Sequence, residues 1–156
     1  MFSDLFTRIL VPYDGSRFSK KALNQAMEIA HNLESEIFVF TVINASYISP
    51  PGMLHGLTKS RSEKKIIEKW KGALQKETEK MLSTAVNRCK KRGITASYHI
   101  SYGNVANEIL SFAKKRKATL IVMGSQGLHG LSKIKILGSV SRKVSELAPC
   151  PVLIVR

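Results

Sequence analysis

The chain has 156 residues, which suits one domain and is too short for two of full size. Hydrophobic residues make up 44% of it, so it can bury a sizeable core, and this excludes the disordered and fibrous classes. The 25 Lys and Arg outnumber the 11 Asp and Glu, giving a net charge of +14. No apolar run reaches the roughly 18 residues that span a bilayer, and residues 1–10 lack a secretory signal pattern, so we expect a cytoplasmic protein without a membrane segment.

The positive charge is concentrated in two stretches. Residues 59–92 hold 12 Lys and Arg and four Glu, and residues 114–117 form a short basic run. Such charge is typical of a solvated surface, of a site for an anionic ligand, or of a surface for nucleic acid. Aromatic residues do not interleave with these basic residues, so no platform for stacking bases is indicated. All three interpretations stay open, and the solvated surface is the simplest.

Apolar runs and helical periodicities alternate from the start of the chain. Thr7 to Val11 is predicted as a strand that stops at a proline, and residues 16–33 as an amphipathic helix capped by Ser16. Residues 37–43 are almost all apolar, as in a parallel strand buried on both faces. Regular patterning then stops over 44–62, and a loop of this length is usually a lid or a disordered segment.

The second half continues the alternation. A long amphipathic helix is predicted over 66–92, with Trp70 on its apolar side and Gly93 after its end. Residues 94–102 alternate between apolar and polar, which predicts a half-exposed strand at a sheet edge with His99 facing solvent. The remaining elements are a helix at 105–113, a buried strand at 120–123, a helix at 140–147 and a strand at 152–155.

This order of elements predicts the fold class. Strands and helices alternate throughout residues 1–156, which indicates a single doubly wound α/β domain of the Rossmann-like kind. Its five-stranded parallel sheet would carry helices on both faces. Ligands in such folds bind outside the carboxyl ends of the strands, where the strand order reverses.

The first candidate binding residue follows the first predicted strand. Asp14 stands between that strand and the next helix, in the sequence VPYDGS at 11–16. A carboxylate there can accept hydrogen bonds from ribose hydroxyls or help to hold a divalent cation. Asp-Gly-Ser is also an ordinary turn and helix cap, and both interpretations are kept.

The second candidate is the glycine-rich segment between a buried strand and a helix start, residues 123–144. Glycines let backbone N–H groups approach a ligand, and a helix start adds a positive dipole end together with the hydroxyls of Ser139 and Ser141. These features suit phosphate groups, although the spacing matches neither a Walker A loop nor GxGxxG. The glycines are Gly124, Gly127, Gly130 and Gly138.

The chain resembles the universal stress protein family over essentially its whole length. The residues that carry the resemblance are ILVPYDGS at 9–16, GNVANEI at 103–109, the strand into MGSQG, the helix start GSVSRKV and the ending APCPVLIVR. The glycines are similar to the motif G-x2-G-x9-G-[ST] of the ATP-binding branch. Residues 128–137 place ten residues where the motif has nine.

The resemblance implies an adenine nucleotide alpha-hydrolase-like fold and binding of ATP or a related adenine nucleotide, with Mg²⁺ or Mn²⁺. It also implies a nucleotide-responsive role in stress or signalling, exerted through a protein partner that the sequence does not name. By position in the motif, Pro12, Asp14 and Val42 would line the adenine and ribose; Met123, Gly124 and Gly127 would border the ribose and first phosphates; Gly138, Ser139, Val140 and Ser141 would hold the other phosphates. Val42 and Met123 also suit an ordinary core.

The last predicted strand favours self-association. Residues 152–155 form an apolar strand without a charge, proline or bulge that would discourage edge pairing. Pairing with the same strand of a second copy would cover this edge, and the resemblance implies such a homodimer. The alternative is that a loop covers it.

Catalysis is indicated more weakly than binding. None of the four histidines shares a short motif with a nucleophile and a carboxylate, although His129 in the glycine segment and His55 in the long loop could each contact a ligand. The sequence therefore predicts at most slow or partner-dependent ATP hydrolysis. The alternative function is a family member that does not depend on nucleotide and binds a polyanion or a partner protein through its basic second helix.

Overall fold

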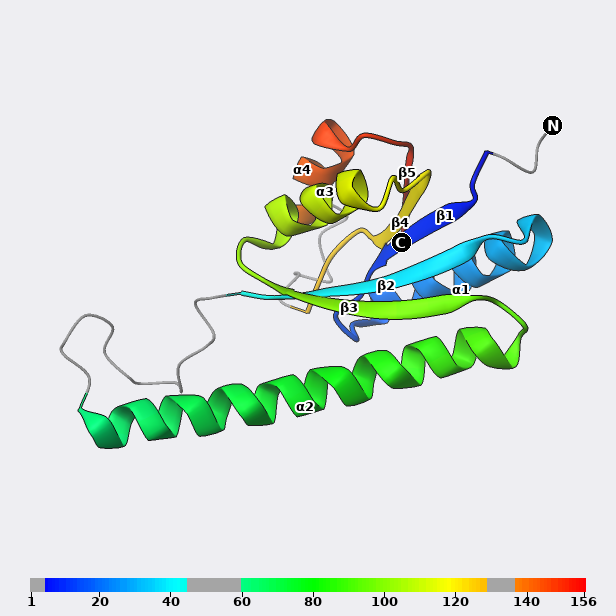
Figure 1. Cartoon of the computed structure of the whole chain (residues 1–156). Helices are drawn as coiled ribbons and strands as arrows, with labels where there is room; N and C mark the ends of the chain where they lie inside the picture. Colours follow the sequence, from blue (N-terminus) through cyan, green and yellow to red (C-terminus); the bar gives the residue numbers. More distant parts are fainter. Residues whose placement is uncertain (1–4, 45–59, 129–136) are drawn as a thin grey trace.

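The computed structural model describes residues 5–44, 60–128 and 137–156. Strands and helices alternate as the sequence predicts (Figure 1). Most of the long loop expected at 44–62 lies outside the described residues, as do His55, His129 and Gly130. The elements are β1 Arg8–Pro12, α1 Arg17–Leu33, β2 Glu36–Ile43, α2 Arg61–Lys91, β3 Ala96–Tyr102, α3 Val105–Lys115, β4 Leu120–Gly124, α4 Ser139–Leu147 and β5 Val152–Val155.

The five strands form one parallel sheet in the order β3-β2-β1-β4-β5. The predicted edge position of residues 94–102 is confirmed, and β5 is the other edge strand. Chain order runs outward from β1 through β2 to β3 and then returns to β4 on the other side of β1. The strand order therefore reverses between β1 and β4, where doubly wound folds bind their ligands.

The central strands are buried on both faces because helices cover each side of the sheet. All five residues of β4 are buried, as the apolar run at 120–123 predicts. On one face, Ile9 and Val11 pack with residues of α1 and α2. On the other face, Leu10 and Ile121 pack with residues of α3 and α4. The predicted doubly wound α/β fold is confirmed.

The apolar side of helix α2 is less completely covered in the first half of the helix than in the second. From Thr78 onward its apolar side packs on the sheet, and Leu82 and Cys89 are fully buried. Nearer the start, Ile67 is buried, whereas Ile66 is 52% exposed and Trp70 39% exposed, so the predicted apolar side is covered only in part there. The reason is geometric, because this half of α2 extends beyond the strands (Figure 1). No helix in the described ranges is both long and apolar enough to cross a membrane.

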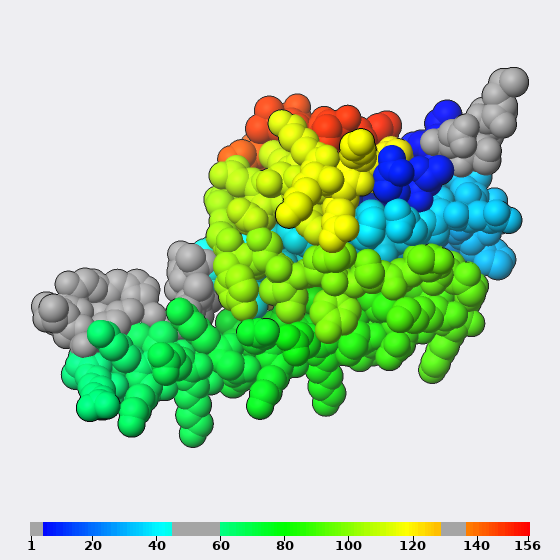
Figure 2. All heavy atoms as spheres, viewed as in Figure 1, coloured from blue at the N-terminus to red at the C-terminus, as the bar shows by residue number. Residues whose placement is uncertain are grey.

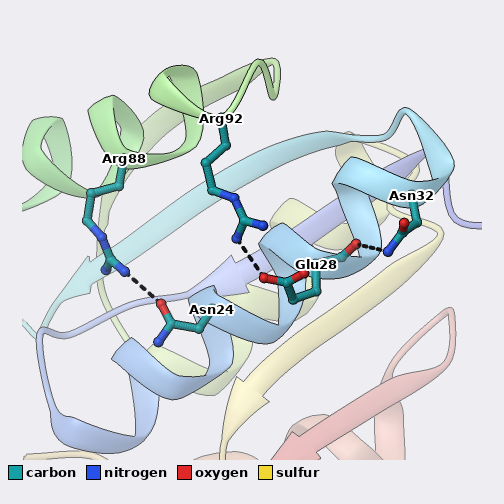
Figure 3. Close-up of polar contacts among 5 residues, drawn as sticks. All are labelled: Asn24, Glu28, Asn32, Arg88 and Arg92. Carbon is teal, nitrogen blue, oxygen red and sulfur yellow. Dashed lines mark hydrogen bonds and ion pairs between the residues drawn. The ribbon is translucent and has the colours of Figure 1, made fainter.

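Two arginines at the end of α2, Arg88 in its last turn and Arg92 at its C-cap, dock this helix on α1 (Figure 3). Arg88 donates from Nη2 to Oδ1 of Asn24 at 2.7 Å, and Arg92 Nη1 lies 2.7 Å from Oε1 of Glu28. The hydrogen bond and charge of Arg92 hold the pKa of Glu28 below its ordinary value. Part of the positive charge of residues 59–92 therefore serves packing between helices.

His99 is only partly exposed, whereas the alternating pattern predicts that it faces solvent. Its ring lies 6.0 Å from the ring of Phe38 and 5.0 Å from that of Phe112, between centroids, and Arg116 lies over both phenyl rings. Burial, and next the charge of Arg116, lower the pKa of His99. Strand alternation shows which side of β3 a residue is on, and α3 covers the side that carries His99.

Two glycines test where helix α2 ends, because Gly72 lies within the helix and Gly93 lies in the turn after it. A Cβ would have open space at both Gly72 and Gly93, but Gly72 is helical while Gly93 has φ +73°. Gly72→Ala should raise the free energy of unfolding by about 0.5–1 kcal/mol. Gly93→Ala should lower it by about 1–2 kcal/mol because an L side chain is strained there. Urea unfolding followed by circular dichroism measures both, and changes of the same sign would contradict the assigned helix end.

Candidate functional site

Asp14 lies in the turn between β1 and α1. Its Oδ1 accepts a hydrogen bond from the Ser16 N–H at 2.9 Å. Ser16 in turn caps α1, because its hydroxyl oxygen accepts from the N–H of Ser19 at 3.1 Å. The predicted turn and cap are confirmed.

The second carboxylate oxygen of Asp14 joins this turn to a distant segment. Oδ2 accepts a hydrogen bond from the N–H of Leu128, 114 residues further along, at 3.1 Å. A Cβ at Gly127 would lie 2.9 Å from the same oxygen, so only glycine fits without displacing the carboxylate. The turn after β1 and the glycine segment after β4 therefore meet at Asp14.

The backbone around Tyr13 fixes this turn against β2. The Tyr13 N–H donates to the carbonyl of Phe40 at 2.8 Å, and the hydroxyl of Thr41 donates to the carbonyl of Tyr13. Burial raises the pKa of Tyr13, so its phenol stays neutral over the physiological range. These contacts place Asp14 next to the carboxyl end of β2, where Val42 lies.

Residues Gly124 and Ser125 hold the end of β4 in place. A Cβ at Gly124 would lie 2.6 Å from Cβ of Phe18 and 2.8 Å from its carbonyl carbon, so α1 requires glycine there. The Ser125 carbonyl accepts from the N–H of Gly138 at 2.8 Å and from the hydroxyl of Ser141 at 2.8 Å. The start of α4 is thereby brought back to the end of β4.

Helix α4 begins with hydrogen-bond donors pointing out of its first turn. Its N-cap is Gly138, which has no side chain to accept from the first N–H groups. Ser139 is exposed, so its hydroxyl can reach a ligand, and its N–H is one of the first-turn donors without an intrahelical acceptor. Ser141 is only 2% exposed, and its hydroxyl also lies 3.0 Å from the Gly138 carbonyl. The Ser141 hydroxyl is thus bonded to backbone carbonyl groups inside the fold.

The residues suggested by the sequence fall into two groups. One lies at the ends of β1 and β4 and at the start of α4, and a chain of contacts connects most of it. The other consists of Met123, which is buried in the core under α3 and α4, and of Val42, which is partly buried and packs against that core, as the ordinary-core alternative allows. The first group is Pro12, Asp14, Gly124, Gly127, Gly138, Ser139, Val140 and Ser141.

Sequence reasoning missed two residues of this site. Ser125 and Leu128 contribute through the backbone, Ser125 by its carbonyl and Leu128 by its N–H. Backbone contacts leave no residue-type signal in a sequence. The position of Ser125 directly after a buried strand, like the position of Asp14 after β1, was the available clue.

The site offers donors for an anion and one carboxylate that can accept from hydroxyl groups. Arg142 is exposed in the first turn of α4, while Lys143 is held toward α3 by donating to Oδ1 of Asn107 at 2.8 Å. Two further lysines of the glycine-rich segment, Lys133 and Lys135, lie outside the described residues. Among the described residues, no group of three His, Cys, Asp or Glu side chains is placed to hold a metal ion. The described chemistry therefore favours binding of a phosphorylated ligand.

Solved structures share this architecture over nearly the whole chain. Universal stress protein UspA from Lactobacillus plantarum aligns with a TM-score of 0.79 at 22% identity, covering 97% of this chain and 98% of that one. An Arabidopsis thaliana family protein with AMP bound aligns at 0.65 and 20% identity, covering 96% and 90%. A universal stress protein from Archaeoglobus fulgidus in complex with dAMP aligns at 0.60 and 23% identity, covering 97% and 99%. At these identities the likeness shows the fold.

Sequence relatives are closer. Universal stress protein YxiE of Bacillus subtilis is 36% identical over 152 residues, which cover 97% of this chain and all of the relative. Universal stress protein MJ0531 of Methanocaldococcus jannaschii is 35% identical, over 98% of this chain and 84% of the relative. The profile of the universal stress protein family matches residues 5–156. The chain belongs to the universal stress protein family.

Proposed function

We propose that this protein binds an adenine nucleotide, with ATP as the expected ligand, across the carboxyl ends of β1 and β4. The observation that carries the proposal is the meeting of Asp14, the Gly127–Leu128 backbone and the start of α4 at the point where strand order reverses. The AMP-bound and dAMP-bound proteins of the same fold support this ligand class.

The two ends of the nucleotide would face different chemistry. Asp14 would accept hydrogen bonds from the ribose, with Pro12 and Val42 beside the adenine, and Met123, Gly124 and Gly127 along the ribose and first phosphates. The other phosphates would accept hydrogen bonds from the first-turn N–H groups of α4, where the helix dipole favours negative charge. Gly138, Ser139 and Val140 contribute there, and Ser141 contributes its N–H because its hydroxyl is already bonded.

A divalent cation would arrive with the nucleotide. Mg²⁺ keeps several waters and binds through one or two carboxylates together with substrate phosphates. Asp14 is the carboxylate at this site, and each of its oxygens already accepts an N–H. Mg²⁺ or Mn²⁺ would therefore be held chiefly by phosphate oxygens and water.

Ligand binding would change the segment after β4. A ribose hydroxyl that donates to Asp14 competes with the Leu128 N–H for the same carboxylate oxygen. Release of the Leu128 N–H would break the link between the turn after β1 and the backbone after β4. This makes the protein a nucleotide-responsive module for stress or signalling, whose association with other proteins changes with occupancy.

A homodimer through β5 is part of the proposal. The strand Val152–Val155 is an edge strand, and Leu153 on it is 39% exposed. An apolar edge pairs readily with a second strand, and two copies related by a two-fold axis cover both edges at once.

Calorimetric titration with Mg-ATP and with adenosine tests the site. Ser139→Ala should lower the affinity for ATP by about tenfold or more, since a hydrogen bond to a charged group contributes about 1.5–3 kcal/mol. Adenosine binding should stay the same because it has no phosphate. Ser145→Ala is the matched control, as this exposed serine lies in the same helix away from its N-terminus. Absence of binding at millimolar nucleotide would refute the function, and equal losses for both ligands would refute the role of Ser139.

A further inference from the structure

Four lysines of α2 form a row on its outer side. Lys65, Lys69, Lys76 and Lys80 follow at intervals of four, seven and four residues, so they lie along one side of the helix, and all four are exposed. At about 1.5 Å per residue the row is about 22 Å long, the length of about six base pairs of duplex. Figure 2 shows side chains of α2 projecting away from the body of the protein.

No carboxylate in the described ranges forms an ion pair with this lysine row. The single ion pair among the described residues joins Arg92 to Glu28. Helix α2 carries ten Lys and Arg against four Glu, and two of these acids are engaged otherwise: Glu63 in the capping box of the helix and Glu79 with Gln75. Arg88 and Arg92 serve the contact with α1, whereas the row makes no such contact. The row therefore presents unpaired positive charge to a partner.

The chemistry of the row favours phosphates over a lipid surface. A helix that lies on a bilayer buries an apolar side in it. The apolar side of α2 is already used from Thr78 to Cys89, where it packs on the sheet. Ile66 and Trp70 are exposed beside the row near the helix start, and between Lys69 and Lys76 the row holds only the small residues Gly72 and Ala73. A partner recognised here is held by charge.

Gly72 leaves a gap in the middle of the row. It lies between the pair Lys65 and Lys69 and the pair Lys76 and Lys80, and a Cβ there would have no neighbour within 4 Å. A phosphate strand can approach the helix backbone at this point with two lysines on each side.

We propose that the lysine row of α2 binds double-stranded nucleic acid through its phosphates, without reading base sequence. Phosphate contacts position a protein on a duplex and carry no sequence information. The surface lies on the α2 side of the sheet and does not include any residue of the nucleotide site, so either proposal can fail without the other.

The test is fluorescence anisotropy with a random-sequence DNA duplex across a salt series. Each phosphate contact contributes about −0.9 to the slope of log affinity against log salt concentration. If four lysines contact phosphates, the affinity should therefore fall by roughly 150-fold between about 50 and 200 mM salt. Lys→Gln at all four positions of the row should make the slope of log affinity against log salt concentration shallower by about 3.6.

The matched control removes the same charge elsewhere. Lys→Gln at Lys20, Lys114, Lys115 and Lys117 changes four exposed residues that lie outside α2. This control should keep the wild-type slope, and both variants should keep wild-type unfolding and nucleotide titrations. Equal loss of slope in both variants, no duplex binding by the wild type at low salt, or row-dependent binding to anionic vesicles with none to duplex would each overturn the proposal.

Discussion

Gly124→Ala is expected to lower the free energy of unfolding by about 1–3 kcal/mol, as overpacking of a tight interior does. The added methyl would lie 2.6 Å from Cβ of Phe18 and 2.8 Å from its carbonyl carbon. Because one of these atoms belongs to the backbone of α1, no side-chain rotation relieves the contact. The helix must move away from β4, and its packing on the buried core is lost in part.

The same substitution three residues later is the control. At Gly127 the methyl would meet the end of the Asp14 side chain at 2.9 Å, and this side chain can give way. We expect Gly127→Ala to change stability by less than about 0.5 kcal/mol, as surface substitutions do. Urea unfolding of both variants measures the difference. Equal stability of the two would show that the approach of α1 does not require Gly124.

Asp14→Asn is expected to weaken nucleotide binding by about tenfold to a hundredfold, since hydrogen bonds to charged groups contribute about 1.5–3 kcal/mol. The carboxylate accepts from Ser16 with one oxygen and from Leu128 with the other. Asparagine has one acceptor oxygen, which can keep the Ser16 bond, and its amide group then faces the Leu128 N–H with a donor. The variant therefore removes the acceptor for ribose and the link to the glycine segment together.

Calorimetric titration with ATP and with adenosine measures this loss, and both ligands should be affected because both carry the ribose. Glu146→Gln is the matched control, as it removes one negative charge from an exposed position in α4 far along the helix from its start. It should leave both affinities unchanged. Wild-type affinity in Asp14→Asn, or an equal loss in the control, would remove Asp14 from the site.

The fold could be predicted from the sequence because the strands of a covered parallel sheet are continuous apolar runs. Residues 37–43 and 120–123 show this most clearly, and both are buried strands of the sheet. The helices between them follow from their periodicity. Strand order does not appear in any local pattern, and only the structure places the reversal between β1 and β4.

The predictions that differ from the structure concern the exposure of side chains whose neighbours in space are distant in the sequence. Trp70 and Ile66 fit an apolar helix side, but periodicity does not tell where the sheet under the helix ends. His99 fits a polar strand side, but the rings of Phe38 and Phe112 from β2 and α3 lie against it and cover it in part. Both are cases in which tertiary packing overrides a correct local pattern.

The candidate site was partly predictable for the same reason. Asp14 and the glycines stand at strand ends that the pattern locates, so their types and positions are visible in the sequence. The need of Gly124 for a close approach by α1, and the use of the Ser141 hydroxyl inside the fold, depend on contacts across the domain. Spacing therefore identified the segment, while the roles of individual atoms required the structure.

The measurement that tests the nucleotide site most directly is a two-dimensional NMR titration of ¹⁵N-labelled protein with Mg-ATP. Binding across β1 and β4 predicts saturable shifts of the N–H signals of Gly127, Leu128 and Ser139, with those of Gly72 and Gly93 unchanged. Absence of shifts at millimolar ATP, or saturable shifts confined to α2 and the sheet edges, would contradict the account.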